Sequence, residues 1–477
     1  MNTDVARRIA AIRRRIDHPI VDGDGHMVEF LPAVRDELVA LAGESMAAGF
    51  DTIFAAGRLS RGLDADTRRS LGLHRLSWWA FPTDTLDRAT AMLPALLAER
   101  LPDLGIDFAV IYPTFGLSVP HIDDADLRRA MCRAFNRYSA RAFAGHGARL
   151  APAAVIPMHS PAEAIDELDF AVEELGLRAA VVAGRVPRPL PGQNQARAAR
   201  WIDTFGPDEP TAYDAVWAHC QKLGITPNFH SSAMGSGSRT SLTSYVHNHI
   251  GNFAAAGEAT CRSLFLAGVP ARFPALTFAF LEGGVAWAAN LFSDLIGHFE
   301  KRGGEAVMQF DPARVDRIEL AELFRRYGSD AFVAALDRLE EGLEVLSDPS
   351  EDPATRDEFR HTGATSAADI RRVFTEQLFF GCEADDPMNR IAFDGQTSPM
   401  GARLRAVFSS DIGHWDVPDM RGVLVEAWED VERGRLDEAD FRDFTFCNAV
   451  DLFSATRPDF FVGTAVEQAA AKHRSGS

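Results

Sequence analysis

Two carboxylates and an imidazole recur at intervals of two residues in the first apolar segment of the chain. The segment runs from Pro19 to Glu29, where Asp22, Asp24 and His26 alternate with glycines. In an extended strand, residues two apart point to the same side, so one strand end can present two oxygens and a nitrogen to one cation. Asp and Gly also mark turns that cap a strand, which gives a structural alternative. Metal ligation and a turn are the two interpretations of this segment.

The composition is that of an ordinary globular protein. Of 477 residues, 46% are hydrophobic and 25% charged, which excludes a disordered chain. The net charge of -19 argues against a nucleic-acid partner. Five cysteines without CxxC spacing predict reduced thiols and no zinc-thiolate site. Because no run approaches about 18 apolar residues and no signal-like segment is present, we expect no membrane association and a cytoplasmic location.

Short apolar segments alternate with helical segments along the chain. The expected strands begin near Pro19, Asp107, Leu150, Leu177, Ile225, Leu276, Gln377 and Val407. Eight strands separated by helices predict an α/β fold, a (β/α)₈ TIM barrel, as a single domain over residues 1–477. Residues 30–100 and 300–370 are predicted as helical insertions after strands one and six. The first insertion includes an aromatic segment, expected to be a lid or an interface, and a helix from Asp84 to Arg100.

The carboxyl ends of the predicted strands hold further polar residues. The active site of such a barrel lies at this end. Strands one, five, six and eight deliver the following donors: Asp24, His26, His230, Glu282, Asp411 and, shortly after it, His414. Imidazoles and carboxylates without cysteine suit a catalytic zinc, manganese or iron(II) centre. A lone histidine here is more often a core residue, but donors at several strand ends together predict a metal site.

The segments Asp24-Gly25-His26, His230 and Ser410-Asp411 make the chain resemble the amidohydrolase-related branch of the amidohydrolase superfamily. The resemblance spans residues 20 to 451. It implies a metal-dependent hydrolase or non-oxidative decarboxylase in which Asp24, His26, His230 and Asp411 hold the metal.

Two positions depart from the pattern of that branch. Glu282 stands where its decarboxylases usually have a histidine, and the segment from Val181 to Arg185 lacks the lysine or glutamate that bridges two metals in binuclear members. One ion is therefore the default, with zinc expected first and iron or manganese as alternatives. A second group is expected to act in catalysis or to hold a second ion: Glu29, Glu282, His414 and His249.

The predicted reaction is hydrolysis or non-oxidative decarboxylation of a small organic carboxylate or amide. In hydrolysis, Asp411 or Glu282 would move the proton of a metal-bound water. Trp415, Trp78 and Arg75 are predicted to contact the substrate. No nucleic acid or membrane is expected as a partner.

Two alternatives stay open. Histidines with carboxylates also resemble iron oxygenase ligation. A subgroup with DGDGH-type starts and SDIGHWD-type ends contains iron- or manganese-dependent hydroxylases of small amino acids, which work as complexes of two related subunits. The chain could also be a non-catalytic partner in such a complex. A homo-oligomer, or a hetero-oligomer with a related subunit, is therefore predicted.

Overall fold

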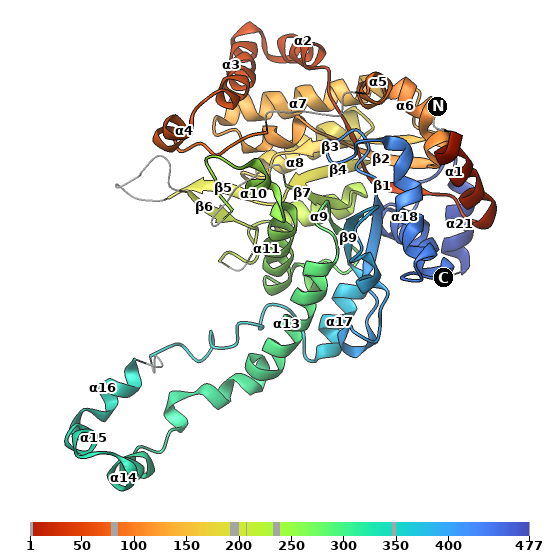
Figure 1. Ribbon diagram of the computed structural model, residues 1–477. Helices are drawn as coiled ribbons and strands as arrows, with labels where there is room; N and C mark the ends of the chain where they lie inside the picture. Colours follow the sequence, from red (N-terminus) through yellow and green to blue (C-terminus); the bar gives the residue numbers. More distant parts are fainter. Residues whose placement is uncertain are drawn as a thin grey trace.

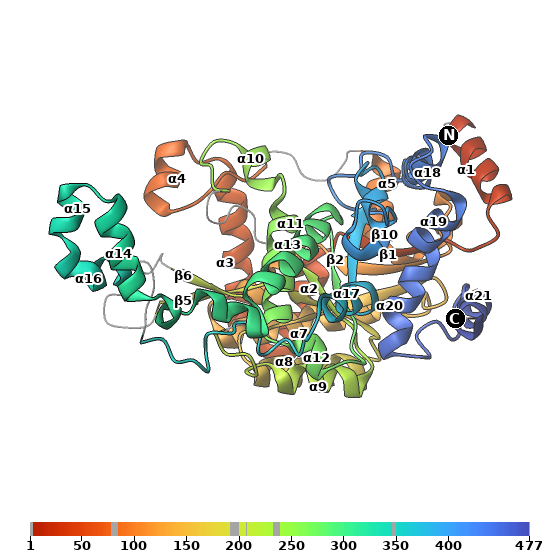
Figure 2. The same ribbon diagram turned by 90° about the horizontal axis from the view of Figure 1, so that it is seen from below.

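The computed structural model describes residues 3–77, 84–190, 200–206, 208–231, 239–345 and 350–476. Eight parallel strands form a nearly closed barrel surrounded by helices (Figures 1 and 2), so the predicted (β/α)₈ fold is confirmed. In barrel order the strands are β1 (Val21–Met27), β2 (Phe108–Pro113), β3 (Leu150–Ile156), β4 (Ala179–Ala183), β7 (Pro227–His230), β8 (Phe278–Phe280), β9 (Leu378–Glu383) and β10 (Arg405–Ser409).

The helices follow the strands as the alternation predicts. The barrel strands are connected or flanked by α1 (Thr3–Arg15), α7 (Ala125–Ala142), α8 (Pro161–Asp169), α9 (Asp214–Leu223), α10 (Tyr245–His249), α11 (Asn252–Leu266), α12 (Val269–Arg272), α13 (Ala286–Arg302), α17 (Ala367–Glu376), α18 (Val423–Glu432), α19 (Glu438–Arg442), α20 (Asn448–Thr456) and α21 (Glu467–Gly476). Within the described ranges no helix is both long and apolar enough to cross a bilayer.

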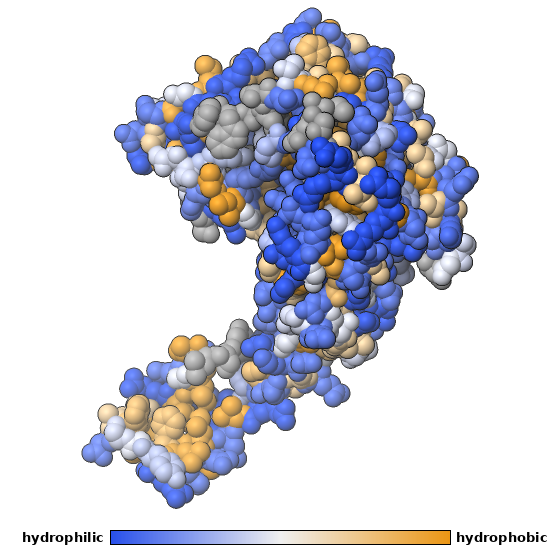
Figure 3. Space-filling view, turned by 45° about the vertical axis from the view of Figure 1, so that its right-hand side comes forward, coloured by the Kyte–Doolittle hydropathy of each residue, from blue (hydrophilic) through white to orange (hydrophobic). Residues whose placement is uncertain are grey.

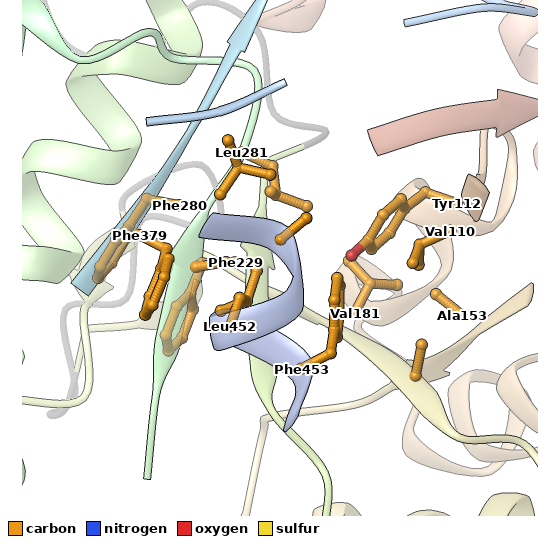
Figure 4. Packing of buried hydrophobic residues seen from close by; sticks show 14 of the residues in the cluster. Val110, Tyr112, Ala153, Val181, Phe229, Phe280, Leu281, Phe379, Leu452 and Phe453 are labelled. Atoms are coloured by element: carbon orange, nitrogen blue, oxygen red, sulfur yellow. The ribbon is translucent and has the colours of Figure 1, made fainter. Parts of the chain in front are cut away.

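Aromatic and aliphatic side chains of neighbouring strands fill the barrel (Figure 4). The rings of Phe229 and Phe280 stack with centroids 5.3 Å apart. Helix α20 lies at the amino ends of β7 and β8, where the hydroxyls of Thr226 and Thr277 donate to the Leu452 carbonyl at 3.2 and 2.8 Å. The carboxyl ends of the strands are left for the site, as in other barrels of this kind.

The barrel closes between β1 and the segment after β10 through a buried aspartate. The Asp22 carboxylate accepts hydrogen bonds from the backbone N–H of Ser410 at 2.9 Å and from the Ser410 hydroxyl. The Asp411 N–H donates to the Asp24 carbonyl at 3.0 Å. The first aspartate of the motif therefore acts in barrel closure, and burial raises its pKa to about 6.

Two local predictions are corrected by the structure. The helix predicted from Asp84 to Arg100 is two helices, α5 (Thr85–Met92) and α6 (Pro94–Arg100), because Pro94 has no N–H to continue the first one. An antiparallel hairpin of β5 (Val186–Pro189) and β6 (Arg200–Asp203) was not predicted. These strands are short and mostly not buried, so they lack an apolar run in the sequence.

Helical segments follow β1 and β8, in the ranges predicted for insertions. The first contains α2 (Leu31–Ala42), α3 (Glu44–Arg61), α4 (Ala65–Leu71), α5 and α6, and α2 packs on α7. The second contains α14 (Arg317–Tyr327), α15 (Asp330–Ala334) and α16 (Leu339–Glu344) and projects from the barrel as an arm (Figures 1 and 2). We call residues 304–345 the arm.

Helix α21 is tied to α20 by a charged hydrogen bond that makes stability depend on pH. The Nε2 of His473 lies 2.8 Å from Asp451 Oδ1, and this hydrogen bond is the main cause that raises the pKa of His473 from 6.5 to about 10. Because the folded pKa is the higher one, the contribution is complete below pH 6.5 and is lost as the pH rises through about 10.

We therefore expect His473→Gln to lower the thermal midpoint at about pH 6, by the equivalent of roughly 0.5 to 1 kcal/mol for a partly exposed pair. Near pH 11 (about one unit above the folded pKa), variant and wild type should coincide. The measurement is thermal unfolding followed by circular dichroism, and an equal deficit at both pH values would contradict this explanation.

Candidate metal centre

Six acidic and imidazole side chains from four strands converge at the carboxyl end of the barrel. They are Asp24 and His26 on β1, His230 on β7, Glu282 after β8, and Asp411 and His414 after β10. All six are buried, each with at most 6% of its surface exposed. The predicted metal ligands and two of the predicted catalytic groups thus lie together.

His26 stands at the centre of this group. Its Nε2 lies 3.4 Å from Asp411 Oδ1, 3.7 Å from Asp24 Oδ1 and 3.3 Å from His230 Nε2. Its Nδ1 lies 3.3 Å from the Pro113 carbonyl, so a proton on Nδ1 would leave Nε2 free for a metal.

Glu282 connects the two sides of the group. One carboxylate oxygen lies 2.7 Å from His230 Nε2, and the other lies 3.5 Å from His414 Nδ1. That same nitrogen is 2.9 Å from Asp411 Oδ1, and the His414 ring stacks on His26 with centroids 4.3 Å apart. A single cation could therefore contact donors from β1, β8 and β10.

The electrostatics of the group fit a divalent cation. Five buried carboxylate oxygens, one of Asp24 and both of Glu282 and Asp411, have no hydrogen-bond partner in good geometry among the described residues. Burial and the neighbouring carboxylates raise the pKa of Asp24, and burial raises that of Asp411 to about 8. Burial and the other two histidines lower the pKa of His26, which favours the neutral imidazole that metals bind.

The pKa of His414 is raised, unlike that of His26, and the pKa of Glu282 is lowered, unlike that of Asp411. Burial alone would lower the pKa of His414, but the charges of Asp411 and Glu282 raise it. Burial raises the pKa of Glu282, but the imidazoles of His414 and His230 outweigh it and lower that pKa. The residues present therefore suit a bound cation, because buried oxygens without partners are costly unless a positive charge compensates them.

Two of these carboxylates sit on strained backbone. Glu282 has φ 58° and Asp411 has φ 50°, in the left-handed region that non-glycine residues rarely adopt. Strain of about 1–3 kcal/mol per residue is typical of functional sites. The loop beyond Asp411 passes close to β1, since a Cβ on Gly413 would lie 2.3 Å from the His26 carbonyl oxygen. Close packing of this loop holds Asp411 and His414 over the end of β1.

A second group of donors adjoins the first through Glu282. His249, Glu282 and Asp416 offer ligand atoms within 4.8 Å of one another, and His249 Nε2 lies 3.6 Å from Asp416 Oδ2. The His249 ring stacks on Tyr245 at 5.1 Å. His247, the other histidine of this helix, is exposed.

Four predicted site residues are not among the donor groups: Glu29, Trp415, Arg75 and Trp78. Glu29 is buried but is not one of the residues of the donor groups, and its carboxylate accepts N–H bonds from residues 114–116 at 2.9–3.3 Å. Trp415 stacks on His414 at 4.4 Å. Arg75 donates to the Arg61 carbonyl, and no contact places it at the donor groups. Trp78 lies outside the described residues.

Sequence reasoning missed several polar groups at the same end of the barrel. Tyr112 on β2 is fully buried, and its ring centroid lies 6.2 Å from that of His26. His121 and His159 follow β2 and β3 without any motif to mark them. Asp416 was not missed in this way, because the segment Asp411-Ile-Gly-His414-Trp415-Asp416 predicts a wall of the site lined by donors. Strand order places all of these residues after or at the carboxyl ends of barrel strands.

The fold and the buried donor groups define a (β/α)₈-barrel protein with a site of the metal-binding type. Residues 64–373 match the family model described as amidohydrolase, and the chain belongs to that family. It is therefore an enzyme of a metal-dependent family, in agreement with the predicted resemblance. No curated protein sequence gives a significant match.

Solved structures resemble the chain over most of its length at low identity. An amidohydrolase from Mycobacterium avium subsp. paratuberculosis K-10 is 16% identical, with 92% of this chain and 98% of that one covered and a TM-score of 0.50. A dihydroxybenzoic acid decarboxylase from Polaromonas sp. JS666, solved with manganese and 2-nitroresorcinol, is 17% identical over 93% and 99%, with a TM-score of 0.47. At 16% identity, the likeness to the Mycobacterium avium amidohydrolase supports the fold alone.

Proposed function

We propose that the chain is a metal-dependent enzyme that hydrolyses or decarboxylates a small organic carboxylate. The observation that supports this proposal best is the group of buried carboxylates and imidazoles that converge around His26 at the catalytic end of the barrel. A divalent ion held by Asp24, His26, His230 and Asp411 would supply Lewis acidity for either reaction. Zinc is the first expectation from the ligand types, with manganese and iron as alternatives.

The chain's own residues supply the other parts of the chemistry. Glu282, between His230 and His414, is placed to accept a proton from a water in hydrolysis or to return one to carbon in decarboxylation. Stacking of His414 on Trp415 and burial of the whole group hold these side chains in one geometry and limit the access of bulk water.

The test is a screen of the metal-loaded protein against small carboxylates and their amides. Release of carbon dioxide distinguishes decarboxylation from hydrolysis, and turnover that vanishes on chelation and returns with added metal supports the proposal. Turnover that survives complete metal removal would overturn it.

Glu282→Gln separates proton transfer from metal binding. The amide keeps the size of the side chain but cannot carry the proton, so we expect kcat to fall by about 10²- to 10⁴-fold while KM changes little. Metal content, measured by elemental analysis, should stay near the wild-type value. A parallel loss of metal would show that Glu282 is a ligand and not the proton carrier.

A second candidate function is supported by the adjoining donor group of His249 and Asp416. Two ions sharing Glu282, with iron present, would favour an oxygen-dependent hydroxylase of a small amino acid, working with a related subunit. An anaerobic assay decides between the two, because hydrolysis and decarboxylation need no oxygen. If Asp411→Ala leaves turnover of such a complex unchanged, this chain is its non-catalytic partner.

A further inference from the structure

Tyr112 places a phenol hydroxyl in the barrel interior beside the metal centre. It is the penultimate residue of β2, and its Cα pairs in register with that of His26 on β1. Its ring centroid lies 6.2 Å from that of His26 and 6.3 Å from that of His230. Figure 4 shows the ring directed into the barrel, away from its own strand. Tyr112 therefore lies against two imidazoles of the metal centre.

The Tyr112 hydroxyl is a buried donor without a partner. Tyr112 is 0% exposed, and its oxygen has no hydrogen bond to any residue that the structure describes. Burial is the main cause that raises the pKa of Tyr112 well above its usual value, and the charges of Asp24 and then Asp22 add to the rise. The hydroxyl therefore lies within electrostatic range of these two carboxylates.

Two other buried tyrosines have hydroxyls that the protein itself satisfies. The Tyr138 hydroxyl accepts the N–H of Phe30 at 3.1 Å, and the Tyr213 hydroxyl donates to the Met158 carbonyl at 2.7 Å. An unsatisfied buried hydroxyl destabilises a fold, so native proteins contain few of them, and functional sites account for some. The exception at Tyr112, beside the metal centre, points to a ligand as the missing partner.

The carboxylates near Tyr112 have other roles. Asp22 accepts hydrogen bonds from Asp24 and Ser410 in the barrel closure. Asp24 is one of the four residues proposed to hold the ion. The acceptor left for the hydroxyl is an oxygen of a molecule bound in the centre. A neutral donor in a fixed, buried position interacts most strongly with an oxygen that carries negative charge.

We propose that the Tyr112 hydroxyl donates a hydrogen bond to an anionic oxygen of the substrate in the metal centre. This inference rests on the proposed function and adds to it a donor from β2, a strand that supplies none of the metal ligands. The hydrogen bond strengthens as negative charge develops on the oxygen, so Tyr112 acts as a catalytic residue in either reaction.

Tyr112→Phe tests the inference, because it removes the hydroxyl and keeps the ring. The probe is acetate, and its binding to the cobalt-loaded full chain is followed by the visible absorption of cobalt. We expect the Kd of acetate to rise about 10-fold or more. The urea midpoint of the metal-free variant should equal or exceed that of metal-free wild type, because the substitution removes an unsatisfied buried group.

Tyr138→Phe is the matched control, with the opposite pattern expected. It removes a hydroxyl that the protein uses, so it should lower the urea midpoint and leave the Kd of acetate unchanged. For Tyr112→Phe, an unchanged Kd overturns the inference, and so does a lowered urea midpoint, since the hydroxyl would then be bonded within the protein. Turnover on adding and removing metal tests the proposed function separately.

A second inference comes from the arm, residues 304–345. None of its side chains is buried. Large apolar residues are exposed along it, including Ile318 (75%), Tyr327 (71%) and Phe332 (60%), and Figure 3 shows an apolar patch on this projecting part of the molecule. Helices this short are not stable without packing, so the arm needs a covering surface.

A complementary surface lies on the barrel body, at residues 58–75 of α3 and α4, which we call the platform. Leu59 and Leu71 are 73% and 60% exposed there. The platform has five arginines and two aspartates, whereas the arm has ten carboxylates and five arginines. The two surfaces therefore match in apolar character and are opposite in net charge.

The arm and the platform lie on the same side of the molecule but well apart. Figures 1 and 2 both show α4 and the helices of the arm on the left, with a gap between them. A twofold axis through this side brings the arm of each copy to the platform of the other and closes the assembly at two copies. The geometry points to a dimer of this kind, in which both apolar patches are buried.

Sedimentation velocity of the full chain at about 10 µM tests the dimer, a concentration at which a standard-sized interface is occupied. We expect Ile318→Asp/Phe332→Asp, in the arm, and Arg58→Glu/Arg61→Glu, in the platform, each to give monomers. Glu174→Arg, an exposed change outside both surfaces, should remain dimeric.

Mixing the two monomeric variants tests the reciprocal docking. An equimolar mixture at about 100 µM should form dimers again, because the intact arm of the platform variant can dock on the intact platform of the arm variant. A monomeric wild type, a variant of either surface that stays dimeric, or a mixture that stays monomeric overturns the proposal.

Discussion

Replacing His26 with alanine is expected to abolish metal binding and to lower kcat/KM by at least about 10³-fold. The Nε2 of His26 lies within 3.7 Å of donor atoms on Asp24, His230 and Asp411, so its loss removes the atom that all of them surround. The remaining buried carboxylates would then repel one another without a full set of ligands. Because the ion is lost with its ligand, this is the largest functional effect that the site predicts.

Metal content by elemental analysis and turnover are the two measurements on this variant. His18→Ala is the matched control, because His18 is also buried, at 7% exposure, and bonds to Thr445 at 3.1 Å on another side of the barrel. The control should lose some stability and keep its metal. A His26→Ala protein with wild-type metal content would refute the assignment of His26.

The second large effect is on stability and concerns barrel closure. In Asp22→Ala, the N–H of Asp24 and both the N–H and the hydroxyl of Ser410 lose their buried acceptor. Leaving buried donors unsatisfied costs about 1–3 kcal/mol each, so we expect a loss of roughly 3 kcal/mol or more.

Urea unfolding and the thermal midpoint measure this effect. Asp22→Asn should cost less, because its amide oxygen still accepts one or two of these bonds. Both variants keep all the donors around His26, so metal binding in the folded fraction should persist. An Asp22→Ala protein as stable as wild type would show that the backbone bond from Asp411 to Asp24 is enough to close the barrel.

The fold could be predicted because its signals are local. Most barrel strands are short apolar runs preceded by a helix, and burial on both faces makes such runs visible in the sequence. The hairpin of β5 and β6 escaped prediction because its residues are partly exposed and have no such run. The break at Pro94 had a visible signal that the long helical pattern obscured.

The site could be predicted only where a motif marked it. Asp24, His26, His230 and Asp411 stand at strand ends, so strand order alone placed them together. Glu29 looked like a spare donor in the sequence, but a carboxylate bound to backbone amides cannot be distinguished from a free one before the turn at residues 114–116 is known. His121 and His159 became visible only when neighbouring strand ends were brought together.

The central claim is that the donors around His26 bind a divalent metal ion. Elemental analysis of protein purified without added metal tests it most directly. The buried donors around His26 predict at least one divalent ion per chain, and two where His249 and Asp416 hold a second. His26→Ala should reduce this content to background. Wild-type protein that contains less than about 0.1 ion per chain and takes up neither zinc, manganese nor iron on addition would contradict the account.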